Sequence, residues 1–433
     1  MKRKVKKFLA SKALLSLIIF LFLYQLFLFT SNGQTDLFST VICNIKSFFK
    51  GNQQNQLEQI QKESKYDVQT PKPNLCPPCN FTPLYPPTSS RRDVVLAASL
   101  NSIEKAEIFV RTLRMTGSLC RIILFIDKNQ KLSPHNFHFF SSCRVEPVMV
   151  NNSNNLILIS GSKMTRYYYY HQWLSKHIKE VDRVLHSDTF DVFFQSDPFS
   201  NEMLPMIEEE EEEINEKENL HLSIKINRQH KTFLSQKVDR KIERKNILYV
   251  SVEPVSLGSS VYTGIWFSKC YGASYFGQYN NYPVSCSGVT MGYSKTFLNY
   301  LNIMFEKANW RQCFGDSLDQ AHHNFVLYHN DIQNAGIEVR PLDCNSEILT
   351  MHFCCKYAKC HLNNITNIFY GNNSNRAPII VHQYNRLQYM VDRNQFFCPG
   401  NSKSLFSNVG NLSELNEIEI LPEIQFPLPD KLS

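Results

Sequence analysis

An uncharged run near the N-terminus constrains this chain more than any other feature of its sequence. Residues 13–30 carry no charged side chain, and the segment before them holds six lysines and arginines and no acid. Eighteen helical residues at about 1.5 Å each span about 27 Å, close to the thickness of a bilayer's hydrocarbon core. The positive-inside rule then predicts a cytosolic basic tail at residues 1–12, a transmembrane signal-anchor at residues 13–30 and export of everything beyond it.

A cleaved signal peptide is the alternative, and it would export the rest of the chain as well. The apolar part of a signal peptide is usually about 7–15 residues long and ends at a small-residue cleavage site. The run here is longer, is aromatic at its far end and lacks such a site. The sequence therefore favours an uncleaved anchor and a single-pass type II membrane protein.

Glycosylation sequons and cysteines agree with export. The N-x-S/T sequons begin at Asn80, Asn151, Asn364, Asn372 and Asn411. All 13 cysteines follow the anchor, where an oxidising compartment favours disulfides over thiolate metal sites. Because 13 is odd, at least one thiol is free or joins another chain. Cys43, next to the membrane, is the candidate for a disulfide-linked dimer, and a free thiol is the alternative.

The positive net charge of the chain belongs mostly to its tail. Removing the six charges of the tail from the net charge of +7 leaves +1 for the exported part. No basic field is left there to hold a phosphate backbone, so we expect no nucleic-acid partner.

Composition divides the exported part into a stem and a folded domain. Residues 31–90 are polar and proline-rich, which is typical of a luminal stem. Cys76 and Cys79 lie in this stem as a C-x-x-C pair, for which a structural disulfide is favoured over a redox site. A type II anchor with such a stem indicates residence in the Golgi or ER membrane. The domain is expected at residues 91–400, with a charged insertion loop at 206–245 and a C-terminal tail at 401–433.

Apolar runs alternate with helical segments in the first half of the domain. Strands are predicted at residues 93–100, 121–127, 144–150 and 182–188, and helices at about 102–115 and 164–181. Such alternation predicts an α/β fold whose mainly parallel sheet is covered on both faces. Ligands of such sheets bind at the carboxyl ends of the strands.

Acidic residues follow the last of these strands, in the segment VLHSDTFDVFFQSDPF at residues 184–199. Asp188 lies at the strand end, and Asp191 follows three residues later. Carboxylates at this place can hold a hard divalent cation. The alternative is that both acids cap a turn, where Asp is common.

The segment resembles the metal-binding region of GT-A glycosyltransferases, the nucleotide-diphospho-sugar transferases. That resemblance implies a Rossmann-like GT-A fold in which a strand-end acidic motif binds Mn²⁺ or Mg²⁺ together with the donor's diphosphate. The spacing here is D-x-x-D rather than D-x-D, which leaves open the pair that binds the metal. The resemblance carries the role to Asp188 and Asp191.

Later segments extend the resemblance to residues 93–390. CSGVTMG, residues 286–292, resembles the strand and turn beside the donor sugar, and Ser287 and Gly288 match it. An ordinary strand turn is the alternative. DSLDQAHHN, residues 316–324, resembles the helix whose acid faces the sugar and the acceptor, and Asp319 and Gln320 match it.

Two further side chains are candidates at the same site. His382, in VHQYNR, resembles a residue on a late strand of similar families and is a candidate third metal ligand, with a hydrogen-bonded core histidine as the alternative. Arg166, ahead of four consecutive tyrosines, is a candidate for binding a phosphate.

The resemblance implies transfer of a sugar from a nucleotide-sugar donor to a glycan, protein or lipid acceptor. In an inverting enzyme Asp319 would be the general base, with Asp316 as the alternative, and in a retaining enzyme the same acid would position the sugar. A competing hypothesis is a catalytically inactive, membrane-anchored ectodomain that binds carbohydrate or a protein partner.

Overall fold

The computed structural model describes residues 76–151, 163–201, 203, 246–306, 308–313, 318–356, 360–371, 376–387, 390, 398 and 419–421. The predicted cytosolic tail, the transmembrane anchor, Cys43 and the charged insertion loop lie outside these described residues. Within them, none of the helices combines the length and the apolar character that a membrane crossing requires.

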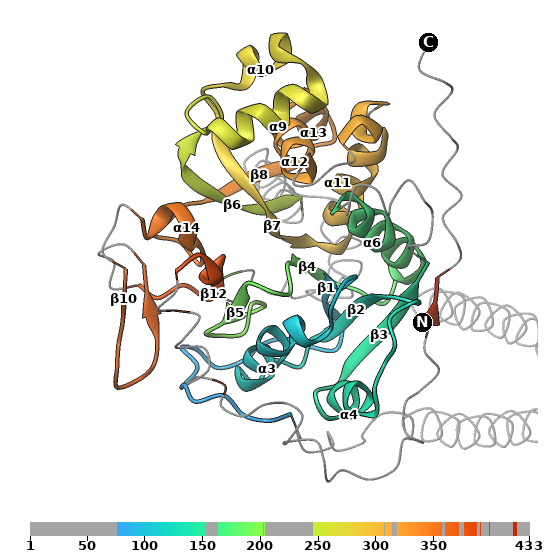
Figure 1. Cartoon of the computed structure of the whole chain (residues 1–433), viewed down its shortest axis with the longest axis vertical. Coiled ribbons are helices and arrows are strands. Elements are labelled where there is room, and N and C mark those ends of the chain that lie inside the picture. The colour runs from blue at the N-terminus through green and yellow to red at the C-terminus, as the bar shows by residue number, and fades with distance from the viewer. Residues whose placement is uncertain are drawn as a thin grey trace, which may run out of the picture. The chain divides into compact units, whose positions relative to one another are not determined.

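An eight-stranded sheet forms the centre of the domain, with the strand order β13-β3-β2-β1-β4-β7-β6-β8 (Figure 1). Its strands are β1 (Asp93–Ala98), β2 (Arg121–Asp127), β3 (Val145–Val150), β4 (Arg183–Ser187), β6 (Ile247–Ser256), β7 (Pro283–Tyr293), β8 (Glu338–Leu342) and β13 (Glu419–Ile420). Strand β7 is antiparallel to β4 and to β6, whereas the other pairs of this described sheet are parallel. The prediction of a mainly parallel α/β sheet is confirmed, and the arrangement is compatible with a Rossmann-like fold.

Helices cover both faces of the sheet. Val94 and Leu96 of β1 pack with α6 (Met164–His177), α9 (Val261–Tyr271), α11 (Ser294–Glu306) and α12 (Leu318–Tyr328). Val95 and Ala97 belong to the other cluster, with residues of α3 (Glu107–Met115) and α4 (Pro134–Ser142). These two helices lie together on one side of the sheet (Figure 1). Because both faces are covered, the predicted strands are continuous apolar runs rather than alternating ones.

A three-stranded sheet, ordered β5-β12-β9, adjoins the central one. It consists of β5 (Val192–Phe194), β9 (Ile348–Thr350) and β12 (Ile380–His382). The antiparallel pairing of β12 with β5 puts His382 opposite Val192, the residue that follows Asp191. Residues almost two hundred positions apart in the sequence therefore meet at one place.

Short elements complete the described fold. They are η2 (Glu104–Ala106), α10 (Ala273–Tyr279), η3 (Ala308–Cys313), α13 (Asn330–Asn334), α14 (Met351–Cys354), β10 (His361–Leu362), β11 (Phe369–Tyr370) and η4 (Tyr384–Arg386).

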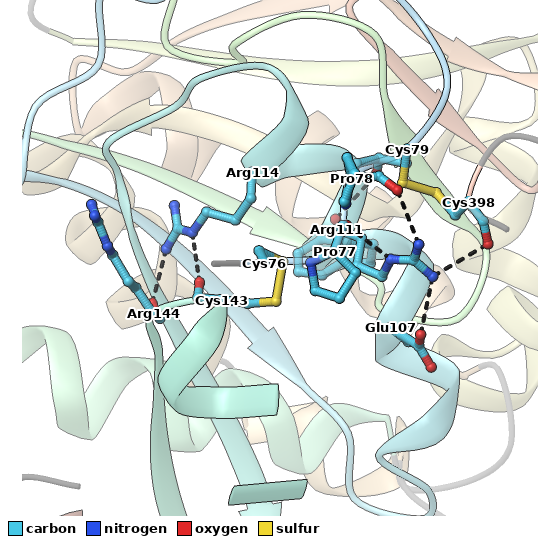
Figure 2. Close-up of a disulfide and its surroundings, with 12 residues drawn as sticks. Cys76, Pro77, Pro78, Cys79, Glu107, Arg111, Arg114, Cys143, Arg144 and Cys398 are labelled. Atoms are coloured by element: carbon cyan, nitrogen blue, oxygen red, sulfur yellow. Dashed lines mark hydrogen bonds and ion pairs between the residues drawn. A yellow bond between two sulfur atoms is a disulfide. The ribbon is translucent and has the colours of Figure 1, made fainter. Parts of the chain in front are cut away.

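The C-x-x-C cysteines form structural disulfides, but with distant partners rather than with each other. Cys76 is bonded to Cys143 and Cys79 to Cys398 (Figure 2). Between them, the buried Arg111 guanidinium of α3 donates to the carbonyl oxygens of Pro77 and Pro78, each at 3.1 Å.

The end of the predicted stem is also bound to the domain. Asp197 Oδ2 accepts hydrogen bonds from the backbone N–H groups of Thr88 and Ser89, at 2.9 and 2.8 Å. The domain boundary predicted at residue 91 is therefore too late, because residues 76–90 belong to the folded unit. These residues are held by disulfides and backbone hydrogen bonds, which leave no apolar periodicity in the sequence.

The remaining described disulfides join Cys270 to Cys313, Cys344 to Cys354 and Cys355 to Cys360. Those of Cys354, Cys355 and Cys360 confirm that this cysteine-rich segment forms disulfides rather than a zinc site. Among the described cysteines, Cys120 and Cys286 are free and buried.

Candidate metal and ligand site

The predicted acids Asp188 and Asp191 lie in the short segment that connects β4 of the central sheet to β5. Asp188 directly follows β4, and Asp191 directly precedes β5. Strand β7 pairs with β4 in the antiparallel direction and carries Gly288. The carbonyl oxygen of Gly288 accepts a hydrogen bond from the Asp188 N–H at 2.8 Å. The site is thus built at the carboxyl edge of the sheet, between β4, β5 and β7.

His382 completes a group of three potential metal ligands. One ligand atom each of Asp188, Asp191 and His382 lies within 4.8 Å of the others. His382 Nε2 is 3.5 Å from Asp188 Oδ2 and 3.6 Å from Asp191 Oδ1. Both His382 Nε2 and Asp191 Oδ1 are buried and have no hydrogen-bond partner within the described structure. Buried polar atoms are normally satisfied, so two carboxylates and an imidazole with such unpartnered atoms could hold a metal ion.

The three groups influence one another electrostatically. Burial alone would raise the pKa of Asp188, but the Arg166 guanidinium and His382 hold that pKa well below its ordinary value. Burial raises the pKa of Asp191 to about 6, against the opposing effect of His382. Burial disfavours the imidazolium of His382, yet Cys286, Asp191 and Asp188 raise its pKa well above the ordinary value.

The backbone at Gly288 lies directly against two of these ligands. A Cβ atom at this position would lie 2.7 Å from Asp188 Oδ2 and closer still to the imidazole of His382. Only glycine leaves that space open. Gly288 and Ser287 lie within β7, so the strand continues through the segment where the sequence resemblance implied a turn.

Arg166 lies between Asp188 and Asp319, the acid on α12, and forms an ion pair with each. It is an ion-pair partner of Asp188, and its Nη2 donates to Asp319 Oδ2 at 2.9 Å. Ser287 Oγ donates to the same Asp319 oxygen at 3.1 Å. Asp319 is 1 % exposed, so it is fully enclosed by the groups it holds.

Helix α12 is fixed on β7 by a set of buried polar contacts. Asn324 Oδ1 accepts from the Ser285 N–H, and Asn324 Nδ2 donates to the Ser285 carbonyl, both at 2.7 Å. His323 contacts Ser285 Oγ at 2.9 Å and Tyr300 OH at 2.6 Å. Burial lowers the pKa of His323 to about 3, so this imidazole is neutral and structural. These contacts set the position of Asp319.

Cys286 lies behind His382. Its Sγ is 3.7 Å from His382 Nδ1, and Gln383 Nε2 donates to it at 3.5 Å. Gln320 Oε1 lies 3.8 Å from the same sulfur. Gln320 therefore contacts Cys286, which in turn contacts His382. A metal-binding imidazole normally has a partner on its second nitrogen, and Cys286 takes that place here.

The structure therefore brings together the predicted residues Asp188, Asp191, Arg166, Ser287, Gly288, Asp319, Gln320 and His382. The other predicted acid, Asp316, lies outside the described residues.

Glu253 on β6 is a site-adjacent residue that the sequence reasoning missed. It is 5 % exposed, and burial raises its pKa to about 7 against the opposing charge of His382. The available signal was a single acid inside the apolar run of residues 247–255.

No protein-family model and no curated protein sequence matches the chain.

Proposed function

We propose that this chain is a metal-dependent glycosyltransferase of the GT-A type, anchored in the Golgi or ER membrane with its catalytic domain in the lumen. It would move a sugar from a nucleotide-sugar donor to a glycan, protein or lipid acceptor. The observation that carries the proposal is the group formed by Asp188, Asp191 and His382 at the carboxyl edge of a mainly parallel sheet.

The residues at this edge suit a diphosphate. A divalent cation held by Asp188, Asp191 and His382 would act as a Lewis acid for the negative charge that develops on the departing diphosphate. The absence of a side chain at Gly288 lets Asp188 and His382 lie directly against the backbone of β7. Arg166 supplies a fixed positive charge next to Asp188, and Asp319 holds that guanidinium in place.

The proposal is tested with the full chain purified in detergent. Thermal unfolding is measured with a panel of nucleoside diphosphates and nucleotide sugars, each with and without Mn²⁺. A ligand at 100 times its dissociation constant adds about 2.7 kcal/mol of apparent stability. We expect stabilisation by one nucleotide class in the presence of Mn²⁺ and its loss in Asp188→Ala.

Asp182→Ala is the matched control. Asp182 precedes the same strand at its opposite end, and its side chain is 48 % exposed. This variant should respond to nucleotide and Mn²⁺ as the wild type does. A well-folded wild-type protein that responds to none of the nucleotides would instead favour the catalytically inactive ectodomain.

A further inference from the structure

The transfer proposed above needs a group that takes the proton of the acceptor hydroxyl when the reaction inverts the sugar. Asp319 is badly placed for that task. Arg166 and Ser287 both donate to its Oδ2, and its side chain is 1 % exposed. Asp188 and Asp191 face His382 as potential cation ligands. Among the described residues, another carboxyl is therefore needed for this task.

Glu253 lies at the same edge of the sheet as the metal-ligand group. Strand β6 is antiparallel to β7, which is antiparallel to β4, so β6 and β4 run in the same direction. Glu253 is in the carboxyl half of β6, and Asp188 follows the carboxyl end of β4. This is the edge at which such sheets bind ligands.

The register between β6 and β7 shifts beside Glu253. The pairs Val250–Thr290 and Val252–Ser285 enclose an irregularity in which β7 has more residues than β6. The extra residues begin at Cys286, whose sulfur meets His382. Bulges re-aim side chains and are frequent next to active sites. Glu253 follows Val252, between this irregularity and a second register shift that ends at Ser256.

The carboxyl of Glu253 is buried without a hydrogen-bond or ion-pair partner among the described residues. It takes part in no hydrogen bond or ion pair in the described structure, although the residue is only 5 % exposed. Its two oxygens have no partner among those residues, yet solvent can still reach them. The carboxyl therefore borders a solvent-accessible space. His382 and Cys286 are the ionisable groups that interact with it.

Two buried acids outside the site, Asp93 and Asp197, differ in this respect. Asp93 is paired with Arg183, and Asp197 accepts from Ser118 Oγ at 2.9 Å and from two backbone N–H groups. Burying a carboxyl without a partner costs free energy. Such groups concentrate at functional sites, because burial moves their pKa toward the working pH. For Glu253 the pKa is about 7.

On the basis of the proposed glycosyltransferase function, we propose that Glu253 is the catalytic base that accepts the proton of the acceptor hydroxyl. The acceptor oxygen forms a bond to the anomeric carbon as the bond from that carbon to the diphosphate oxygen breaks. The proton passes to the Glu253 carboxylate, and the nucleoside diphosphate leaves with the electron pair. Direct displacement of this kind inverts the anomeric configuration.

The test compares the full-length wild type with Glu253→Gln and with the control Glu338→Gln. Glu338 lies on neighbouring β8 with a side chain that is 54 % exposed. Two quantities are measured for each protein: Mn²⁺-dependent thermal stabilisation by nucleoside diphosphates, and release of nucleoside diphosphate from nucleotide sugars supplied with oligosaccharide acceptors.

We expect Glu253→Gln to keep the stabilisation and to lose turnover by about 10²–10⁴-fold, mostly in kcat. The wild-type rate should fall as the pH drops below about 7, where the base becomes protonated. The residual rate of the variant should not show this decrease. Glu338→Gln should behave as the wild type. The product should have the anomeric configuration opposite to that of the donor.

Three results would overturn the assignment of Glu253 alone: unchanged turnover in Glu253→Gln, loss of its nucleotide stabilisation, or a product with retained configuration. A folded wild type with neither nucleotide stabilisation nor turnover would overturn the proposed function together with this role.

Discussion

Arg166 and Asp319 form an ion pair that is closed to solvent, with Arg166 Nη2 2.9 Å from Asp319 Oδ2 and side-chain exposures of 9 and 1 %. Arg166 is also paired with Asp188. One guanidinium therefore ties α6 to the end of β4 and to the start of α12. Because Asp319 is buried and the Asp188 side chain is 13 % exposed, the pair of Arg166 and Asp319 has a structural role at the centre of the site.

We expect Asp319→Asn to destabilise the domain by about 2 kcal/mol, because it removes the charged acceptor of the hydrogen bonds from Arg166 and Ser287. The free energy of unfolding in denaturant is the measurement. Asp343→Asn is the control, since Asp343 is an exposed turn residue whose acceptor role Asn can keep. An unchanged stability with an altered pH profile of turnover would instead make Asp319 the base.

Gly288→Ala should remove Mn²⁺-dependent nucleotide stabilisation while the domain still folds. The added Cβ would overlap with His382 and lie 2.7 Å from Asp188 Oδ2, which displaces potential metal ligands. Gly277→Ala on α10 is the matched control, because nothing lies within 4 Å of its added Cβ. Differential scanning fluorimetry with and without Mn²⁺ separates the variants, and equal responses would refute the placement of the metal beside Gly288.

Glu253→Gln should stabilise the protein at alkaline pH. The folded-state pKa of Glu253 is about 7, above the ordinary value of 4.5. The folded state therefore binds more protons between these values, and its stability falls as the pH rises through this window. Unfolding measured at pH 8 should show the variant to be more stable by up to about 3 kcal/mol, with little difference at pH 4. Equal stability at pH 8 would mean that the carboxylate is compensated.

Glycosylation should distinguish the described sequons by their burial. Asn80 and Asn364 are exposed, and Asn367 Nδ2 donates to the Asn80 carbonyl at 2.9 Å, so both sequons belong to one surface. Asn151 is 8 % exposed, and its carbonyl accepts from the Tyr169 hydroxyl at 3.0 Å. Peptide mass spectrometry of protein from a secretory host should find glycans at Asn80 and Asn364 and none at Asn151. A glycan at Asn151 in folded protein would contradict this packing.

Local patterns were enough to predict the first half of the fold. Strands β1 to β4 are apolar runs of ordinary length, and Asp188 lies at the end of β4 as expected. The sequence could not decide between a core histidine and a metal ligand for His382. Its pairing opposite Val192 depends on the register of β12 with β5, which no local pattern specifies.

Glu253 and the start of the folded domain could not be predicted either, because both depend on contacts between distant parts of the chain. Glu253 lies beside a register shift between β6 and β7, and a single sequence does not reveal where two strands lose register. The predicted start of the folded domain was too late because Cys398 and Asp197, far away in the chain, hold residues 76–90. Disulfide partners cannot be read from spacing alone.

The Cys79–Cys398 disulfide joins two residues that are 319 positions apart, and the charged segment at 206–245 lies between them. A protease that cuts this segment once would divide the polypeptide without releasing either fragment. The nicked protein would run as two bands on a denaturing gel only after reduction. A clipped preparation would consequently pass for intact material by size, and its loss of activity, if any, would come from changed geometry rather than from a missing piece.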